Sequence, residues 1–285
     1  MSLKIKITLF LTVCCFILGG IFLSEARKSG KFRLIACDVG QGDGLLLISP
    51  GGSQVVVDGG PGNAISGCLS RYMPFWDRTL EAIVLTHPHS EHMEGFLDVF
   101  AKYKVKTVVT TQTINKTALF KEWEKAIKAS GARVYVPKIG DRLKLDKLTL
   151  EVMWPTQDKI ALWRISPPSD LNDTSILMRA DYGNFCAYLT GDLPKEVLAK
   201  LIDRKCDVLK VVHHGSRTGT NDMVVSEISP KIALIQVGAK NSYGHPHAEV
   251  LDALRKYGVK ILRNDLNGNI EVDSSGSGFT VTTDR

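Results

Sequence analysis

The sequence predicts a layered sandwich of the α/β class, formed by one large domain. The chain divides into two successive halves, and each half contains several short apolar runs and flanking amphipathic segments. Strand-like runs often follow one another with only a glycine-bearing turn between them, which favours packed sheets over a doubly wound parallel sheet. Residues 32–285 contain no second linker and no short-period repeat. With 285 residues, 44% of them hydrophobic, the chain can bury a large core.

The first half is predicted to be rich in strands, because its apolar runs are short and contain many Val, Ile and Leu residues. Two helices are expected there, at Glu91–Tyr103 and Asn115–Ser130. In the first of these, Met93, Phe96 and Phe100 fall on one helical face. The predicted strands are Phe32–Cys37, Gly44–Ile48, Gln54–Val57, Leu80–Thr86, Val105–Thr110, Val134–Val136, Leu143–Leu145 and Leu148–Met153.

The second half continues with strands and helices in alternation. Helices are expected at Pro194–Ile202, Asp222–Ile228 and Ala248–Tyr257. The predicted strands are Ser175–Arg179, Phe185–Leu189, Val208–Val212, Ile232–Val237, Val259–Leu262, Asn269–Val272 and Phe279–Thr283.

Residues 1–26 are predicted to be a signal peptide or an N-terminal membrane anchor, followed by a linker at residues 27–31. Lys4 and Lys6 precede the apolar run Ile7–Leu23, and the small residues Ser24 and Ala26 follow it. A cleaved signal and a retained tether through residues 7–23 remain alternatives. Both place the body outside the cytoplasm, in the extracellular space or at the cell surface. Disulfides are possible there between the four body cysteines, Cys37, Cys68, Cys186 and Cys206.

All seven histidines fall in three short clusters. His87, His89 and His92 follow a predicted strand, His213 and His214 are adjacent, and the third cluster consists of His245 and His247. Side chains two residues apart in an extended segment point the same way, so His87 and His89 can reach one metal ion. Glu91 and His92, at the start of a helix, can hold a second ion. A buried or surface histidine is a common alternative for one residue but not for four potential ligands within six residues.

These motifs resemble the metallo-β-lactamase superfamily. The first histidine cluster has that family's His-x-His-x-x-His pattern, and Asp58-Gly59-Gly60 and Thr190-Gly191-Asp192 follow predicted strands in the family's order. The motifs Asp38-Val39-Gly40-Gln41-Gly42-Asp43, His213-His214-Gly215-Ser216 and Gly244-His245-Pro246 resemble the extracellular hydrolase domain of the ComEC DNA-uptake family. Residues 32–285 contain none of the apolar channel helices of that family, so this chain is not expected to form a channel itself. The resemblance implies a four-layer αββα sandwich over residues 32–285.

The resemblance also implies a role for each matching residue. His87 and His89 would hold one divalent ion, Glu91, His92 and His245 a second, and Asp192 would bridge the two ions, expected to be Zn²⁺ or Mn²⁺. Asp192 and Glu91 would steer a hydroxide, and His213 or His214 would contact the phosphate or protonate the leaving group. Asp58 would orient a ligand histidine, Asp43 would stand at the mouth of the site, and His247 is left out of the metal set.

This sequence departs from the superfamily pattern at two positions. Glu91 stands where Asp is usual, and its longer side chain displaces the carboxylate. No histidine lies between His92 and His213, where many superfamily members have a further ligand. Asp173 can substitute as an oxygen ligand, and more oxygen ligands would favour Mn²⁺ or Mg²⁺.

The leading functional prediction is hydrolysis of phosphodiester bonds, with DNA as the favoured substrate and a link to competence. A formal net charge of +6 agrees with an anionic substrate, but only weakly. The first alternative is a hydrolase of a lactone, β-lactam or other carbonyl substrate. The second is a degenerate, non-catalytic fold that binds DNA.

Overall fold

The computed structural model describes residues 5–7, 10–13, 15 and 30–285. Its larger sheet contains the N-terminal strands together with the last two strands of the chain. These strands are β1 (Phe32–Ala36), β2 (Leu45–Ile48), β3 (Gln54–Val57), β5 (Ala82–Leu85), β7 (Thr107–Thr110), β8 (Arg133–Tyr135), β16 (Ile270–Ser274) and β17 (Phe279–Thr283). Their spatial order is β17-β16-β1-β2-β3-β5-β7-β8.

The second sheet contains the strands of the middle and later chain. They are β9 (Arg142–Leu145), β10 (Leu148–Trp154), β11 (Leu177–Tyr182), β12 (Phe185–Leu189), β13 (Val208–Lys210), β14 (Ile232–Ile235) and β15 (Lys260–Arg263), in the spatial order β15-β14-β13-β12-β11-β10-β9. A small third sheet pairs β4 (Thr79–Leu80) with β6 (Lys104–Val105).

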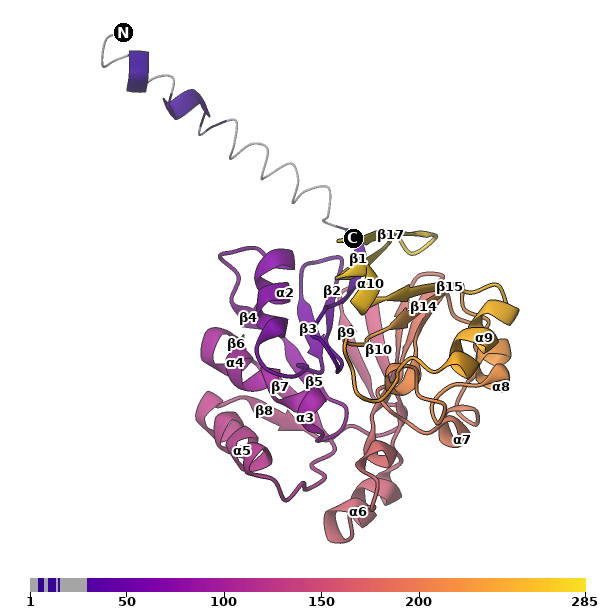
Figure 1. Cartoon of the computed structure of the whole chain (residues 1–285). Helices are drawn as coiled ribbons and strands as arrows, with labels where there is room; N and C mark the ends of the chain where they lie inside the picture. The colour runs from indigo at the N-terminus through magenta and orange to yellow at the C-terminus, as the bar shows by residue number, and fades with distance from the viewer. Residues whose placement is uncertain (1–4, 8–9, 14, 16–29) are drawn as a thin grey trace.

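Helices cover the outer faces of both large sheets (Figure 1). α2 (Ala64–Tyr72), α4 (Gly95–Lys102) and α5 (Ala118–Ser130) pack on the first sheet, and α7 (Lys195–Leu198), α8 (Asp222–Ile228) and α9 (Ala248–Lys256) pack on the second. Within residues 30–285 the other helical segments are α3 (Ser90–Met93), α6 (Gln157–Ile165), α10 (Asn264–Asn267) and the short 3₁₀ segments η1 (Leu171–Thr174) and η2 (Val212–Gly215). The predicted αββα sandwich is therefore confirmed.

The apolar runs read in the sequence form three buried layers. Alternate residues of a strand face opposite sides of its sheet, so Leu34 packs between the two sheets whereas Ile35 packs against the first helix layer. In the second sheet, Ala187 faces the other sheet and Tyr188 faces the second helix layer. Because both faces are covered there, central strands such as β2, β5, β12 and β14 are apolar throughout, whereas β10 and β16 alternate apolar and polar residues.

Parallel strand pairs bring several strand ends to one edge of the sandwich. β3, β5 and β7 are parallel neighbours in the first sheet, and β12, β13 and β14 are parallel neighbours in the second. Parallel strands end at the same edge, so the loops after them lie close together. These loops carry Asp58, His87, Asp192, His213 and His214.

The helices differ from the prediction in several places. α2 and α6 were not predicted; α2 contains Gly67 and three serines or cysteines, which are weak helix formers. The predicted helix Glu91–Tyr103 is divided into α3 and α4, because the backbone N–H of Gly95 donates to the Gly60 carbonyl instead of continuing the helix. α5 begins after Thr117, whose side chain accepts from the Phe120 N–H, and not at Asn115.

The predicted signal peptide or anchor at residues 1–26 and most of the linker at 27–31 lie largely outside the described residues. Among the residues that the structure does describe, no helix is long and apolar enough to cross a membrane. The four body cysteines form two disulfides, Cys37–Cys68 and Cys186–Cys206, whose Cα atoms are 5.9 and 5.0 Å apart.

Candidate metal centre

Four imidazole rings converge on one buried carboxylate at the edge where the parallel strands end. The Nε2 atoms of His92, His214, His213 and His87 lie 3.3, 3.5, 3.7 and 3.9 Å from Oδ2 of Asp192. We call these four histidines and Asp192 the Asp192 cluster. Its members come from the loops after β5, β12 and β13, so both sheets contribute to it.

Each buried ring of the cluster is fixed through its other nitrogen. His92 Nδ1 lies 2.8 Å from Oδ2 of Asp58, and His214 Nδ1 lies 2.9 Å from the Gln236 carbonyl. His87 Nδ1 lies 3.1 Å from the Thr86 hydroxyl. With Nδ1 engaged, Nε2 is left to face Asp192. Metal-binding histidines are commonly oriented in this way by a carboxylate or carbonyl.

Asp58 is itself held rigidly. It accepts hydrogen bonds from the Thr86 backbone N–H at 2.8 Å and from the Thr86 hydroxyl at 2.7 Å. Its φ of 59° places it in the left-handed region, where Asp is tolerated better than most residues. His213 and His214 also have positive φ values, 51° and 54°. Non-glycine residues in this region are uncommon and gather at functional sites.

The polar atoms at the centre of the cluster suit a metal ion. His92 Nε2, His214 Nε2 and both carboxylate oxygens of Asp192 are buried and make no hydrogen bond in the described part of the chain. Burying such atoms without a partner is costly. Three sets of three residues have potential ligand atoms within 4.8 Å of one another: His87, His92 and Asp192; Asp43, Asp58 and His92; and Asp43, Asp192 and His214. Imidazole nitrogen with carboxylate oxygen is a donor set for Zn²⁺, Mn²⁺ or iron.

Lys210 lies at the base of the cluster, and the sequence analysis did not identify it. Its side chain is buried, with Nζ 3.0 Å from the Gly191 carbonyl and 3.7 Å from Oδ1 of Asp192. It also forms a close ion pair with Asp43. Lys210 is the last residue of an apolar strand, and only this position suggests that its charge points inward.

The charges of the cluster shift its pKa values in opposite directions. Burial alone would raise the pKa of Asp192, but His214, His92 and Lys210 hold it well below its usual range. Burial alone would lower the pKa of His92, but Asp192 and Asp58 raise it well above its usual value. Burial and the neighbouring His92 lower the pKa of His87. The metal-free cluster therefore favours a carboxylate at Asp192 and an imidazolium at His92.

Some predicted site residues lie at the edge of the cluster. His89 is half-buried, with Nδ1 3.0 Å from His87 Nε2. The ring of His245 is centred 5.7 Å from that of His213, and burial together with His214 and His213 lowers the pKa of His245 to about 4. Their roles as metal ligands stay predictions.

Other predicted residues lie elsewhere. The Glu91 carboxylate accepts a hydrogen bond from the Ser90 hydroxyl at 2.9 Å and belongs to none of the candidate ligand groups among the described residues. Asp173 is also in none of them, and its backbone carbonyl accepts from the Trp154 indole. Asp43 is 2% exposed, so it lies beneath the site and not at its mouth as predicted. Its ion pair with Lys210 compensates for the loss of solvation at this buried position.

Solved structures with the same architecture resemble this one. The metallo-beta-lactamase fold protein YhfI from Bacillus subtilis superposes with a TM-score of 0.54 over 81% of this chain and 96% of that chain, at 14% identity. The chain has the metallo-β-lactamase fold. The diiron β-hydroxylase CmlA from Streptomyces venezuelae also matches, with a TM-score of 0.54, 12% identity and coverage of 86% of this chain and 54% of that chain. Zn²⁺-bound PqqB from Methylobacterium extorquens matches with a TM-score of 0.52 and 11% identity, over 78% of this chain and 85% of that chain.

Relatives of this metallo-β-lactamase-fold chain confirm the predicted resemblance to the ComEC family. ComE operon protein 3 of Bacillus subtilis is 29% identical over 91% of this chain and 35% of the relative. Competence protein ComA of Neisseria gonorrhoeae is 26% identical over 87% of this chain and 33% of the relative. Recombination protein 2 of Haemophilus influenzae is 23% identical over 89% of this chain and 30% of the relative. The chain thus spans about a third of the length of these relatives. No family model matches the chain.

Proposed function

We propose that this protein is an exported metal-dependent hydrolase that cleaves phosphodiester bonds in DNA. The observation that carries the proposal is the Asp192 cluster, in which four imidazole Nε2 atoms surround one carboxylate oxygen at 3.3–3.9 Å. The choice of DNA is supported by relatives named for competence and recombination. Fold alone does not fix the reaction, since a diiron hydroxylase shares it.

His87, His92, His214 and Asp192 are the residues that would hold a divalent ion, because they are buried and the Nε2 atoms of the three histidines lie 3.3–3.9 Å from the Asp192 carboxylate. The prediction that the site binds two divalent ions, Zn²⁺ or Mn²⁺, is kept here as part of the proposal. When bound, such ions supply electrophilic activation of water and of a phosphoryl oxygen. The chain's own contribution is to fix the donor atoms in place before the substrate arrives.

His213 is the member of the Asp192 cluster that is best placed to contact substrate. Its side chain is 26% exposed, whereas that of His214 is 3% exposed. His214 is engaged on both sides, with Nδ1 near Gln236 and Asp43 and Nε2 facing Asp192. We therefore assign to His213 the hydrogen bond or proton transfer at the leaving oxygen, and to His214 the role of ligand. Glu91, with its carboxylate half-exposed beside Ser90, would steer the attacking water from the rim.

Two features support a location outside the cytoplasm, where the protein would meet external DNA. The N-terminal pattern of Lys4, Lys6 and the apolar run at residues 7–23 is typical of an export signal or a membrane tether. The two disulfides agree with an oxidising compartment, because such bonds are rare in the cytosol.

The test is a cleavage assay with the full-length protein on fluorescent single- and double-stranded DNA, with added Mn²⁺, with Zn²⁺ or with EDTA. Variants His92→Ala and Asp192→Asn remove cluster members. His247→Ala is the matched control, because His247 lies outside the Asp192 cluster and its ring instead contacts that of His245. Bound metal is measured in every sample. We expect metal-dependent cleavage that falls by about a hundredfold in the two cluster variants and persists in the control.

Several outcomes would contradict the proposal. Cleavage that survives His92→Ala would indicate a contaminating nuclease. Retained metal without DNA cleavage, together with turnover of a lactone or β-lactam, would establish the carbonyl hydrolase. Tight DNA binding without turnover under any metal would establish the non-catalytic fold.

A further inference from the structure

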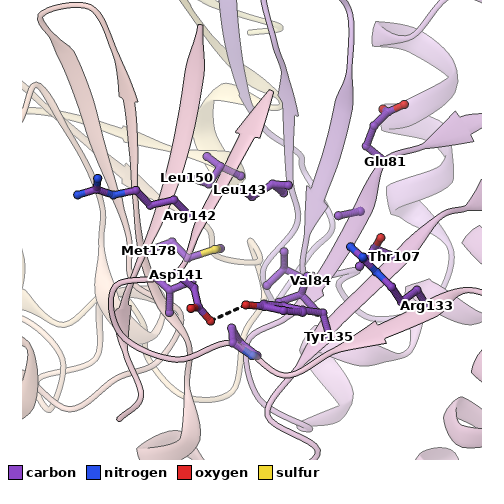
Figure 2. Close-up of a pocket in the computed structure, with 14 residues that line it drawn as sticks. Glu81, Val84, Thr107, Arg133, Tyr135, Asp141, Arg142, Leu143, Leu150 and Met178 are labelled. Atoms are coloured by element: carbon purple, nitrogen blue, oxygen red, sulfur yellow. Dashed lines mark hydrogen bonds between the residues drawn. The ribbon is translucent and has the colours of Figure 1, made fainter. Parts of the chain in front are cut away.

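A cavity lies between the two sheets at the edge of the sandwich, and none of its lining residues belongs to the Asp192 cluster. Its volume is about 240 Å³. Its walls come from the end strands of the two sheets, β8 and β9, and from their neighbours β5, β7 and β10 (Figure 2). The connection between Tyr135 and Arg142 passes from one sheet to the other beside it.

The inner walls of this cavity are apolar. Val84 and Val109 line the first sheet, and Leu150, Val152 and Met178 line the second. Protein interiors are close-packed, and an empty apolar space larger than a few water molecules forfeits contacts on every side. An apolar cavity of about 150 Å³ holds benzene, which has six carbons, so this one has room for an alkyl chain of roughly ten carbons.

The charged groups around the cavity leave one cation without a partner. Glu81 pairs with Lys106 at 3.1 Å, Asp141 with Lys138 at 3.0 Å, and Arg142 with Glu151 at 3.0 Å. Arg133, on β8, is exposed and lines the cavity, and its side chain makes no ion pair and no hydrogen bond within the described residues. Figure 2 shows Arg133 beside Thr107 on one wall, whereas the guanidinium of Arg142 points away from the space.

We propose that this cavity binds a single-chain amphiphile, with its alkyl chain between the sheets and its carboxylate on Arg133. The apolar walls exclude a ligand that is polar along its length, and the unpaired guanidinium selects an anionic head group. A guanidinium presents parallel N–H donors that match a carboxylate. Tyr135 already donates its hydroxyl to Asp141 at 2.7 Å, so Arg133 supplies the free donors at this mouth.

A competing explanation is that Arg133 protects an exposed sheet edge. An inward-pointing charge on an end strand such as β8 discourages pairing with another molecule. That explanation predicts that Arg133→Ala promotes self-association and that no ligand is bound. The amphiphile proposal predicts a specific loss of ligand affinity in a protein that stays monodisperse.

The test is isothermal titration of the full-length protein with decanoate, decanol and acetate. Decanoate has both the chain and the charge, decanol has only the chain, and acetate has only the charge. We expect decanoate to bind and acetate not to bind, with decanol weaker by about tenfold. Arg133→Ala is expected to weaken the affinity for decanoate by a similar factor. Arg142→Ala is the matched control, since its guanidinium already pairs with Glu151, and its affinity should stay near that of the wild type.

Val109→Phe tests the alkyl site by placing a ring inside the cavity, and it is expected to abolish decanoate binding. If that variant does not fold, the comparison between the two arginine variants still decides. No decanoate binding by the wild type, equal affinity for decanoate and decanol, or equal losses in Arg133→Ala and Arg142→Ala would each overturn the proposal. A phosphate-headed chain that binds and displaces decanoate would identify a lipid source for the same chemistry.

Discussion

Lys210 and Asp43 form a buried ion pair beneath the Asp192 cluster. Both side chains are almost fully buried, and Asp43 Oδ1 also lies 3.1 Å from His214 Nδ1. Burial alone would raise the pKa of Asp43, but Lys210 and His214 lower it. The pair therefore connects the strand β13 to the loop that precedes β2, and it supports His214 from below.

Removing the charge of Lys210 is expected to destabilise the protein strongly. Lys210→Met leaves Asp43 buried without its cation, which costs about 3–5 kcal/mol when a buried pair loses one partner. Urea unfolding measures the change. Lys205→Met, at an exposed position, is the control and should change the free energy of unfolding by less than about 0.5 kcal/mol. Adding Asp43→Asn to Lys210→Met should recover much of the loss, and no recovery would show that the ion pair is not its cause.

The two adjacent histidines of the Asp192 cluster should behave differently. His214→Ala removes a buried donor and is expected to reduce bound metal about tenfold or more. His213→Ala removes a half-exposed group, so it should retain metal while the turnover of DNA falls by about a hundredfold. Metal content and turnover measured on the same samples separate the two effects. Equal metal loss in both variants would argue against assigning the leaving-group contact to His213.

Metal binding should strengthen as the pH rises. The pKa of His92 lies well above its usual value, since Asp192 and Asp58 outweigh the effect of burial. A cation must displace this proton, so affinity should rise about tenfold per pH unit for each proton released. A chelator competition at roughly pH 6 to 9 measures the dependence. Asp58→Asn should shift the rise in metal affinity to lower pH, because it removes one of the two carboxylates that raise the pKa of His92.

The same raised pKa sets the sign of the pH dependence of stability in the metal-free protein. Because the folded state raises the pKa of His92 above its unfolded value, protonated His92 stabilises the fold. This contribution is complete below about pH 6.5 and is lost as the pH rises through the folded pKa. EDTA-treated protein should therefore lose this part of its stability at higher pH. The difference in free energy of unfolding between the wild type and His92→Ala isolates this contribution. A difference that does not change with pH would contradict the assignment.

The disulfide Cys186–Cys206 is expected to stabilise the fold by restricting the unfolded chain. It closes a segment with a sequence separation of 20, which corresponds to about 3 kcal/mol in the chain-entropy description. The Cys186→Ser/Cys206→Ser double variant should lose about that much free energy of unfolding under oxidising conditions. Under reducing conditions both proteins lack both disulfides, so the free energy of unfolding of the variant should match that of the wild type. A difference that persists there would point to lost packing.

The sequence predicted the layers well because the central strands are buried on both faces. Their continuous Val, Ile and Leu runs are recognisable without alternation, and β1, β12 and β14 lie close to the expected ranges. The helix α2 was missed since its Gly67 and serines give low intrinsic helicity. That helix forms because Ile65 and Leu69 are buried against the first sheet, which is a tertiary effect that propensity does not report.

The site was predicted only in part, for a similar reason. Histidine spacing identified His87 and His92, whose geometry follows from one strand and one turn. Lys210 was missed because a lysine at a strand end is usually exposed, and only the second sheet's position against the first encloses it. His214 was expected in catalysis, but its left-handed backbone conformation turns its ring into the cluster. Such a conformation cannot be read from residue type alone.

The pairing of β1 with β16 has a consequence for the order of synthesis and folding. Arg33 faces Asp273 across this pair and forms an ion pair with Glu271, so residues about 240 positions apart are neighbours. Until the ribosome has made residue 274, one edge of the first strand has no partner, and contacts of such long range form slowly. The nascent chain therefore presents an open strand edge at β1 until β16 has been made, which makes chaperone protection during synthesis valuable.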